Sequence, residues 1–297
     1  MSSEGDTLLL TGHESDLGGG FIVHRLLPSG KRQRVGPFIF FDHFGPVMHP
    51  PEANTDVRPH PHIGLATVTY LFEGAMMHRD SLGSVQRIEP GAINWMSAGR
   101  GIVHSERTPD DLRTVPRASH GLQLWVALPA DQEETEPSFA HTGSEQIPEV
   151  PLDGAHVRVL VGSAWGATSP VRPNSDTLYL DIRLEPGRTL DLPALATEMA
   201  VYGVDRPLTI NGAPLPSHTM AVVDGAAQIR NDTDGELRFV VIGGEPFEGD
   251  RFIWWNFVSS RKERVAQAAQ DWDAKRFADV PGEHERIDLP VRRPHWF

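Results

Sequence analysis

The chain has 297 residues, enough for one large domain or two of ordinary size with a buried core that needs no disulfides. Hydrophobic residues make up 39% and charged residues 23%, which excludes disorder, collagen and coiled coil as descriptions of the whole chain. The net charge of −13 argues against direct nucleic-acid binding, and the absence of cysteine excludes disulfides and thiolate chemistry. Any metal ion must therefore be bound by His, Asp or Glu.

The N-terminal residues 1–6 contain no cationic region that leads into a long apolar stretch. No window reaches the roughly 18 uninterrupted apolar residues of a membrane-spanning helix. The lack of cysteine fits a reducing compartment. We therefore expect a cytoplasmic protein that has no membrane partner.

The first motif along the chain is His60-Pro61-His62. Residues i and i+2 of a strand point to the same side, so both imidazoles can reach one metal ion. His104-Ser105-Glu106 has the same spacing with a carboxylate as its second member. On facing strands of a small barrel, the two pairs would bring three imidazoles and one carboxylate together. This set suits Fe(II), Mn, Ni, Cu or Zn, and leaves two positions of an octahedral ion for water, O₂ or substrate.

A plainer interpretation is that these histidines only satisfy hydrogen bonds, since the chain contains 14 of them. The presence of both pairs favours the metal site. His43 and His78 are weaker candidates for contacts with the ligands or the substrate, and structural roles explain them equally well. Gly99 and Gly101 favour a tight turn just before His104.

Two later segments, 121–128 and 178–185, alternate apolar residues with a period of two, which predicts strands with one buried face. Asn211-Gly212 is typical of a hairpin turn because both residue types tolerate positive φ. Asp234-Gly235, before the apolar segment 237–242, favours a second hairpin.

The acidic segment 129–151 has little periodicity and favours a surface linker. We therefore predict a metal-binding domain over 1–135, a linker over 136–152, and a second domain over 153–297. Segments 88–91 and 184–187 are weakly similar in sequence, which agrees with a duplication of the domain.

Segment 259–277 lacks Pro and Gly, which predicts a helix that closes the second domain. Its expected buried face consists of Val265, Ala268, Ala269, Trp272 and Phe277.

Five segments in order resemble the pirin family of the cupin superfamily: FIFFDHFGP (38–46), RPHPHIG (58–64), DSLG (80–83), WMSAGRGIVHSE (95–106) and GLQLWV (121–126). The resemblance covers about the first 130 residues. It implies an all-β fold of two stacked cupin barrels, each a double-stranded β-helix or jelly roll, with a short C-terminal helical segment.

In pirins the N-terminal barrel holds one metal ion, usually iron, through three histidines and a glutamate. Carried over by motif, the ligands are His60, His62, His104 and Glu106, the same four residues that the spacing indicates. Many cupins take the glutamate a few residues after the first histidine pair. Here the first carboxylate after His62 is Glu73, so we expect Glu106 to fill that role.

The second domain has no paired histidines, and its His156 and His218 are isolated, so we expect a barrel without metal there. The stretch around Trp254-Trp255 resembles a bacterial subgroup and not the nuclear eukaryotic form, which argues against a transcriptional role. The family resemblance implies that this stretch packs on the N-terminal barrel, where the two indoles would be buried.

The resemblance implies a metal-dependent dioxygenase, most simply with Fe(II), that cleaves quercetin-type flavonols with O₂ and releases carbon monoxide. Its partners would be an aromatic small molecule and O₂, and Glu106 could also take the proton of the substrate hydroxyl. One alternative is a non-enzymatic protein that senses redox state through bound iron and acts on a protein partner. Another is a non-redox cupin such as a sugar isomerase. The sequence leaves the oligomeric state open.

Overall fold

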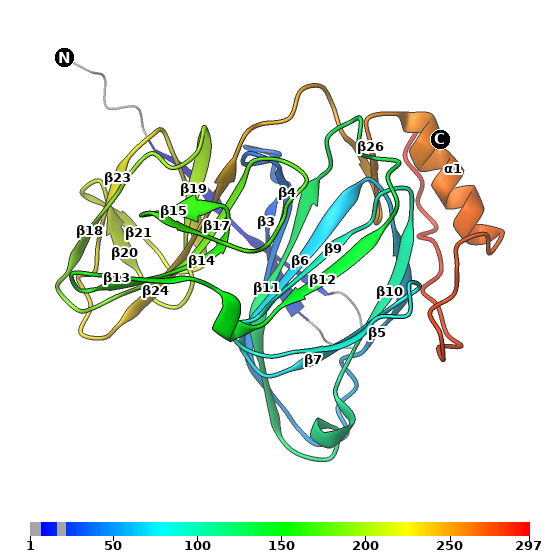
Figure 1. Cartoon of the computed structure of the whole chain (residues 1–297), viewed down its shortest axis with the longest axis horizontal. Coiled ribbons are helices and arrows are strands. Elements are labelled where there is room, and N and C mark those ends of the chain that lie inside the picture. The colour runs from blue at the N-terminus through cyan, green and yellow to red at the C-terminus, as the bar shows by residue number, and fades with distance from the viewer. Residues whose placement is uncertain (1–6, 17–21) are drawn as a thin grey trace. The chain divides into compact units, whose positions relative to one another are not determined.

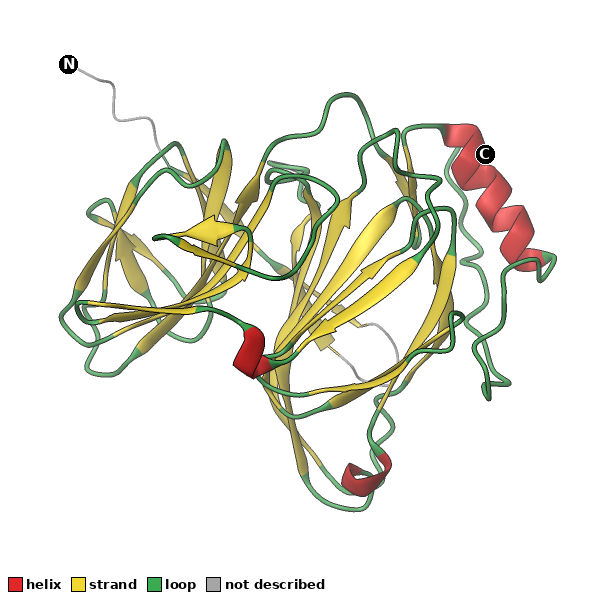
Figure 2. Cartoon of the chain, viewed as in Figure 1, coloured by secondary structure: helices red, strands yellow, loops and turns green. Residues whose placement is uncertain are grey.

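The computed structural model describes residues 7–16 and 22–297, so the N-terminal residues 1–6 that we read as lacking a leader lie outside it. Strands make up nearly all of its regular structure, and the described residues contain one α-helix (Figures 1 and 2). The all-β prediction is therefore confirmed. The chain divides into two compact units that are interleaved in sequence. Unit 1 comprises Met1–Ser15, His24–Asp42 and Glu145–Pro246, and unit 2 comprises Asp16–Val23, His43–Ser144 and Phe247–Phe297.

These units differ from the contiguous domains that we predict from composition. The C-terminal segment belongs to unit 2 instead of closing the second domain. The physical reason is a hydrophobic cluster in which Trp254, Phe257 and Trp272 pack with Ile63 and Val103. Trp254 is buried as expected, whereas Trp255 is only partly buried and packs against the same cluster.

Unit 1 contains a seven-stranded sheet, a four-stranded sheet and a small two-stranded ribbon. The seven-stranded sheet has the order β1 (Leu8–Thr11), β22 (Thr219–Val223), β19 (Glu198–Gly203), β24 (Leu237–Gly244), β17 (Thr177–Leu184), β14 (Ala155–Val161) and β13 (Glu149–Leu152). The four-stranded sheet has the order β18 (Thr189–Leu192), β23 (Ala227–Arg230), β20 (Leu208–Ile210) and β21 (Ala213–Leu215). The ribbon consists of β15 (Ser163–Ala164) and β16 (Ala167–Thr168).

Unit 2 contains most of a second seven-stranded sheet, of which most of β2 and parts of β3 and β4 are assigned to unit 1. Its order is β12 (Ser138–Thr142), β9 (Ile93–Ser97), β6 (Leu65–Glu73), β11 (Arg117–Ala127), β4 (Phe38–His49), β3 (Ile22–Leu27) and β2 (His13–Asp16). A four-stranded sheet has the order β5 (Val57–His62), β10 (Ile102–Arg107), β7 (Met76–Asp80) and β8 (Val85–Ile88). The remaining elements are β25 (Phe252–Trp254), β26 (Phe257–Ser259), the helix α1 (Lys262–Asp273) and the short 3₁₀ turns Asp110–Leu112 and Ser144–Gln146.

The two sheets of unit 1 enclose an apolar core, which the alternation of β17 predicts in part. Leu178, Leu180 and Ile182 point into this core as expected. Tyr179 and Asp181 on the opposite face are also buried, so the strand has two covered faces and not one. On the outer face Phe38 packs edge-on against Tyr179, with ring centroids 6.4 Å apart. Arg238 donates a 2.8 Å hydrogen bond to Asp181 on the same face.

The two predicted hairpins have different outcomes. Asn211 and Gly212 have φ of 49° and 81° and join β20 to β21, which pair directly, so this hairpin is confirmed. Asp234-Gly235 is not a hairpin turn, because the flanking strands β23 and β24 belong to different sheets. The loop there is organised by buried Asn231, whose side-chain amide donates to the Leu184 and Gly235 carbonyls at 2.9 and 2.8 Å.

The acidic segment predicted as a linker contains two short strands, β12 and β13. Each lies at the edge of a seven-stranded sheet, pairing with β9 and β14 respectively. An edge strand meets solvent on more sides than a central one, so polar residues suffice and the apolar alternation is lost. Composition alone therefore does not distinguish this segment from a linker.

The predicted helix is present but shorter. Val265, Ala268, Ala269 and Trp272 form the buried face of α1, as expected. The helix ends at Asp273, and Lys275 just beyond it has a positive φ of 55°, a conformation that stops helices. Phe277 therefore packs from outside the helix, with its ring centroid 6.1 Å from that of Phe257.

A buried carboxylate in the acidic segment anchors the start of this C-terminal helix. Glu133 is 3% exposed and accepts hydrogen bonds from the Ser259 hydroxyl at 2.9 Å and from the Ser260 main-chain N–H at 2.8 Å. The Arg251 Nε lies 3.0 Å from the same carboxylate. All four residues belong to unit 2.

We expect Glu133→Ala to lower the free energy of unfolding by about 3 kcal/mol, because it leaves a buried arginine and two donors without their acceptor. Glu134→Ala is the matched control, since Glu134 is more exposed and its ion pairs with Arg261 and Arg264 are worth at most about 1 kcal/mol. Urea unfolding followed by tryptophan fluorescence measures both variants. Equal small losses for the two variants would contradict an anchoring role for Glu133.

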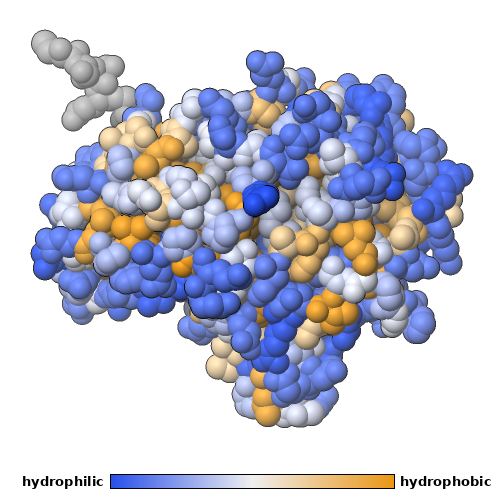
Figure 3. All heavy atoms as spheres, viewed as in Figure 1, coloured by the Kyte–Doolittle hydropathy of each residue, from blue (hydrophilic) through white to orange (hydrophobic). Residues whose placement is uncertain are grey.

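On the face drawn in Figure 3, hydrophilic residues cover most of the surface, as the 40 acidic and 27 basic residues lead us to expect. Within residues 7–16 and 22–297, no helix has the length and apolar character needed to cross a membrane.

Candidate metal centre

The two predicted pairs, His60/His62 and His104/Glu106, lie on adjacent strands of the four-stranded sheet in unit 2, and not on facing strands as we expected. His104 on β10 is directly opposite His60 on β5, and Ile102 is opposite His62. The three imidazoles therefore share one face of the sheet. The register shifts between His104 and Glu106, where β5 has one extra residue, so the strand bends just beyond the cluster.

Prolines alternate with the histidines on β5 without disrupting the sheet. The strand lies at the edge of the sheet, where Pro59 and Pro61 need no ladder partner for the N–H that they lack. The C-terminal part of the chain covers this edge. The Ile287 N–H donates to the Pro59 carbonyl at 2.9 Å, and the Val258 N–H donates to the Ile63 carbonyl at 3.2 Å.

The three histidines converge on one point. One ligand atom from each of His60, His62 and His104 lies within 4.8 Å of the other two, and all three side chains are buried. The Nε2 atoms of His62 and His104 are only 3.1 Å apart, and the ring centroids of His60 and His104 are 4.4 Å apart. Among the described residues, this is the one group of three or more His, Asp or Glu with such geometry.

The hydrogen bond of His60 indicates which of its ring nitrogens faces the cluster. Its Nδ1 lies 2.9 Å from the Arg58 carbonyl, to which it donates a proton. This bond leaves the lone pair on Nε2 and fixes the orientation of the ring, the arrangement common to metal-bound histidines.

Burial keeps the three imidazoles neutral. It lowers the pKa of His60 to about 4, with a smaller opposing contribution from the Arg58 carbonyl. Burial and the neighbouring histidines also lower the pKa values of His62 and His104 well below the usual value. At neutral pH the lone pairs are therefore free to bind a cation.

Glu106 lies two residues after His104 on β10, on the same face. It does not belong to the group of residues whose ligand atoms all lie within 4.8 Å of one another. Burial raises the pKa of its carboxyl group to about 7. No hydrogen bond or ion pair to this carboxylate is present among the described residues. The spacing thus places Glu106 beside the triad, and its role as a fourth ligand stays a prediction.

The residues fit a divalent metal ion. The two buried Nε2 atoms of His62 and His104 lie 3.1 Å apart, close enough for one cation to be bound by both. A desolvated carboxyl group beside neutral imidazoles has no cationic partner, and an ion would supply one. His60, His62 and His104 would hold the ion, with Glu106 completing the set.

His78, a weaker candidate, lies next to the triad but its ring nitrogen is engaged elsewhere. Its Nε2 is 2.9 Å from the Asp80 carboxylate, and its ring centroid is 5.4 Å from that of His104. Burial alone would raise the pKa of Asp80, but hydrogen bonds from His78 and the Ser84 main chain lower it. His78 is therefore a fixed neighbour of the cluster.

His43, the other weaker candidate, is paired with another histidine on the large sheet. Its Nε2 lies 2.9 Å from Nε2 of His120, and the two rings stack with centroids 5.0 Å apart. Phe72 packs edge-on against both rings. The pair is buried among aromatic residues and does not belong to the group formed by His60, His62 and His104.

A carboxylate that the sequence analysis missed holds the outer side of the ligand-bearing strand. Ser105, between His104 and Glu106, donates a 2.8 Å hydrogen bond to Glu283, which also pairs with Arg107. Glu283 thus holds β10 on both sides of Glu106. No sequence signal singles it out, because it lies 178 residues from Ser105 in a polar tail.

The glycines before His104 form the expected turn. The Gly101 N–H donates to the Ala98 carbonyl at 2.9 Å, and Gly99 has φ of 48°. A Cβ on Gly99 would lie 2.1 Å from the Thr135 carbonyl oxygen, so no larger residue fits there. The chain therefore enters β10 at a fixed angle.

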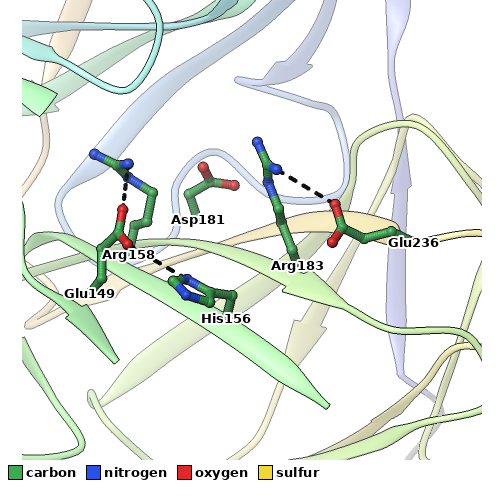
Figure 4. A pocket seen from close by; sticks show the side chains of 6 residues that line it. All are labelled: Glu149, His156, Arg158, Asp181, Arg183 and Glu236. Carbon is green, nitrogen blue, oxygen red and sulfur yellow. Dashed lines mark hydrogen bonds and ion pairs between the residues drawn. The ribbon is translucent and has the colours of Figure 1, made fainter. Parts of the chain in front are cut away.

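The histidines of unit 1 have other surroundings. His218 lies beside His24, with ring centroids 5.3 Å apart. His156 lines a surface cavity of about 280 Å³ with five charged residues (Figure 4). Within it Arg158 pairs with Glu149 at 2.7 Å and Arg183 with Glu236 at 3.6 Å, so the charges largely neutralise one another.

Comparison with known proteins identifies both halves of the chain. The model of the Pirin family matches residues 20–126, and that of the Pirin C-terminal cupin domain matches residues 179–278. A pirin-like protein from Caulobacter vibrioides is 44% identical over 287 residues, which cover 95% of this chain and 99% of the relative.

Two crystal structures of quercetin 2,3-dioxygenase from Acinetobacter baumannii have a similar fold. The first has a TM-score of 0.89 and 35% sequence identity, covering 97% of this chain and 96% of that one. The second has a TM-score of 0.85 and 26% identity, covering 92% of this chain and 98% of that one. The expectation of a two-cupin fold is confirmed.

Proposed function

Because the chain belongs to the pirin family of cupin proteins, we propose that it is a metal-dependent dioxygenase that cleaves flavonol-like substrates with O₂. The observation that carries the proposal is the buried group of His60, His62 and His104, with one ligand atom of each within 4.8 Å of the others. The likeness to the two Acinetobacter enzymes supports the choice of substrate class.

Fe(II) is the ion that we propose, although the same ligands accept Mn, Ni, Cu or Zn. Three histidines and one carboxylate leave two positions of an octahedral ion open. A redox-active ion bound there would supply the electron transfer that overcomes the spin barrier between O₂ and an organic enol. The protein's own contribution is to keep the imidazoles neutral and in a fixed orientation.

Aromatic side chains next to the histidines suit a flat substrate. The Trp125 ring lies 5.3 Å from that of His62, and the Phe139 ring stacks on His78 with centroids 4.1 Å apart. These surfaces can hold an aromatic ring by stacking and exclude water from the reacting atoms. Glu106, two residues after His104 on the same strand, would take the proton of the substrate's enol hydroxyl.

The test is oxygen uptake with quercetin after anaerobic loading of the protein with Fe(II), alongside a Zn(II)-loaded sample. We expect one O₂ consumed and one carbon monoxide released per quercetin with iron, and neither with zinc, which has no redox chemistry. Equal turnover with zinc would indicate a non-redox cupin. No uptake despite one bound iron per chain would favour a metal-bound interaction protein.

A further inference from the structure

Two rows of side chains cross the large sheet of unit 2 on the face that meets the histidine cluster. The first, which we call the aromatic row, runs from strand to strand through directly opposed residues: Phe139, Met96, Thr67 and Trp125. Its two ends touch the metal-centre region, since Trp125 lies against His62 and Phe139 stacks on His78. The aromatic row therefore faces the candidate metal centre.

The second row, which we call the polar row, lies two residues farther along each strand and consists of His141, Asn94, Thr69 and Gln123. Residues i and i+2 share a face, so this row faces the same side as the aromatic row at a spacing of about 6.6–6.8 Å. Asn94 and Thr69 are 4% and 6% exposed.

The polar row lies between apolar layers. Leu71, two residues beyond Thr69 on the same face, packs with Phe44, Ile88 and Ala92 in a separate hydrophobic cluster. Burying amides and hydroxyls costs free energy unless they are hydrogen-bonded.

Hydrogen bonds within the polar row engage the side-chain oxygen atoms of Gln123 and Asn94 and leave their NH₂ groups unused. The Thr69 hydroxyl donates to Oε1 of Gln123 at 2.9 Å, and Nδ1 of His141 lies 2.7 Å from Oδ1 of Asn94. The side-chain NH₂ groups of Asn94 and Gln123 have no acceptor among the described residues. These N–H groups can donate to oxygen atoms of a ligand.

We propose that the polar row is a second substrate subsite, which binds oxygen atoms on the part of an aromatic substrate remote from the metal. The ligand class is a polyhydroxylated aromatic molecule of two or more rings, since a single ring beside the metal would not span the distance between the rows. This inference rests on the proposed function, because it assumes that the substrate's enol lies at the metal centre.

The test compares two flavonols under anaerobic conditions with Fe(II)-loaded protein, so that binding is measured without turnover. Quercetin has hydroxyl groups on both ring systems, whereas 3-hydroxyflavone has only the enol hydroxyl. We expect Asn94→Leu and Gln123→Leu each to weaken quercetin binding about threefold to tenfold, the effect of one lost hydrogen bond. Binding of 3-hydroxyflavone should stay within about twofold.

Thr69→Val keeps the shape of the side chain, so a change in binding cannot be put down to misfolding. We expect it to weaken quercetin binding about threefold, because Gln123 loses the hydrogen bond from Thr69 that fixes its orientation. Gln267→Leu, on the exposed side of α1, is the matched control and should change neither affinity. Equal losses for both flavonols, or none, would overturn the subsite. If the discrimination persists but quercetin is never consumed, the proposed reaction fails and the subsite stands.

Discussion

We expect His62→Ala to abolish stoichiometric metal binding and, with it, quercetin-dependent oxygen uptake. His62 contributes one of the two Nε2 atoms that lie 3.1 Å apart at the centre of the cluster. Mutating a residue that only contacts a metal-binding side chain typically lowers the affinity for the metal 10-fold to 100-fold. Removing a metal-binding side chain itself should therefore lower that affinity at least about 100-fold. Equilibrium dialysis against Fe(II) under argon, followed by iron analysis, measures the effect.

His156→Ala is the control for this variant, because it removes a histidine from unit 1 that lines a charged surface cavity. It should bind one iron per chain with unchanged affinity. Retention of one tightly bound iron by His62→Ala would show that the metal lies elsewhere. Circular dichroism of both variants checks that the strands remain intact.

The second large effect is expected for Glu106→Gln, which keeps an oxygen atom in place but cannot accept a proton. We expect oxygen uptake per bound iron to fall about 10²-fold to 10⁴-fold, the usual contribution of a general base. A carboxylate held by a dication has a lowered pKa and is a weak base until it leaves the ion, so this role needs direct testing. The measurement is uptake divided by the iron content of the same sample.

Glu73→Gln serves as the comparison for Glu106→Gln, since Glu73 is the first carboxylate after His62 and is exposed at the end of β6. It should leave uptake unchanged. If Glu106→Gln retained its iron and consumed oxygen at the wild-type rate, Glu106 would have no part in proton transfer.

The i, i+2 spacing predicts that His60 and His62 lie on one side of their strand. The approach of His104 to them could not be predicted from spacing alone, because it depends on the pairing of β5 with β10. The role of the three histidines as ligands remains a prediction, as does that of Glu106. The polar row could not be predicted in this way. Its members come from four strands, and only the register of those strands brings Asn94, Thr69 and Gln123 side by side.

Local patterns failed where long-range packing decided the outcome. Asp234-Gly235 has the composition of a hairpin turn, but the strand that follows it pairs with β17 and β19. Glu133 lies in a segment whose acidity suggested a linker, yet it is buried against residues more than 120 positions away. Such contacts leave no periodic trace in the sequence.

The most direct test of the proposed reaction is isotopic labelling of the product formed from quercetin by the Fe(II)-loaded protein. Under ¹⁸O₂ in ordinary water, we expect both labelled atoms in the ring-opened product and unlabelled carbon monoxide, as dioxygen insertion requires. A ring-opened product without ¹⁸O from ¹⁸O₂, or one that takes up label in the reciprocal experiment with ordinary O₂ in H₂¹⁸O, would contradict a dioxygenase acting at the centre formed by His60, His62 and His104.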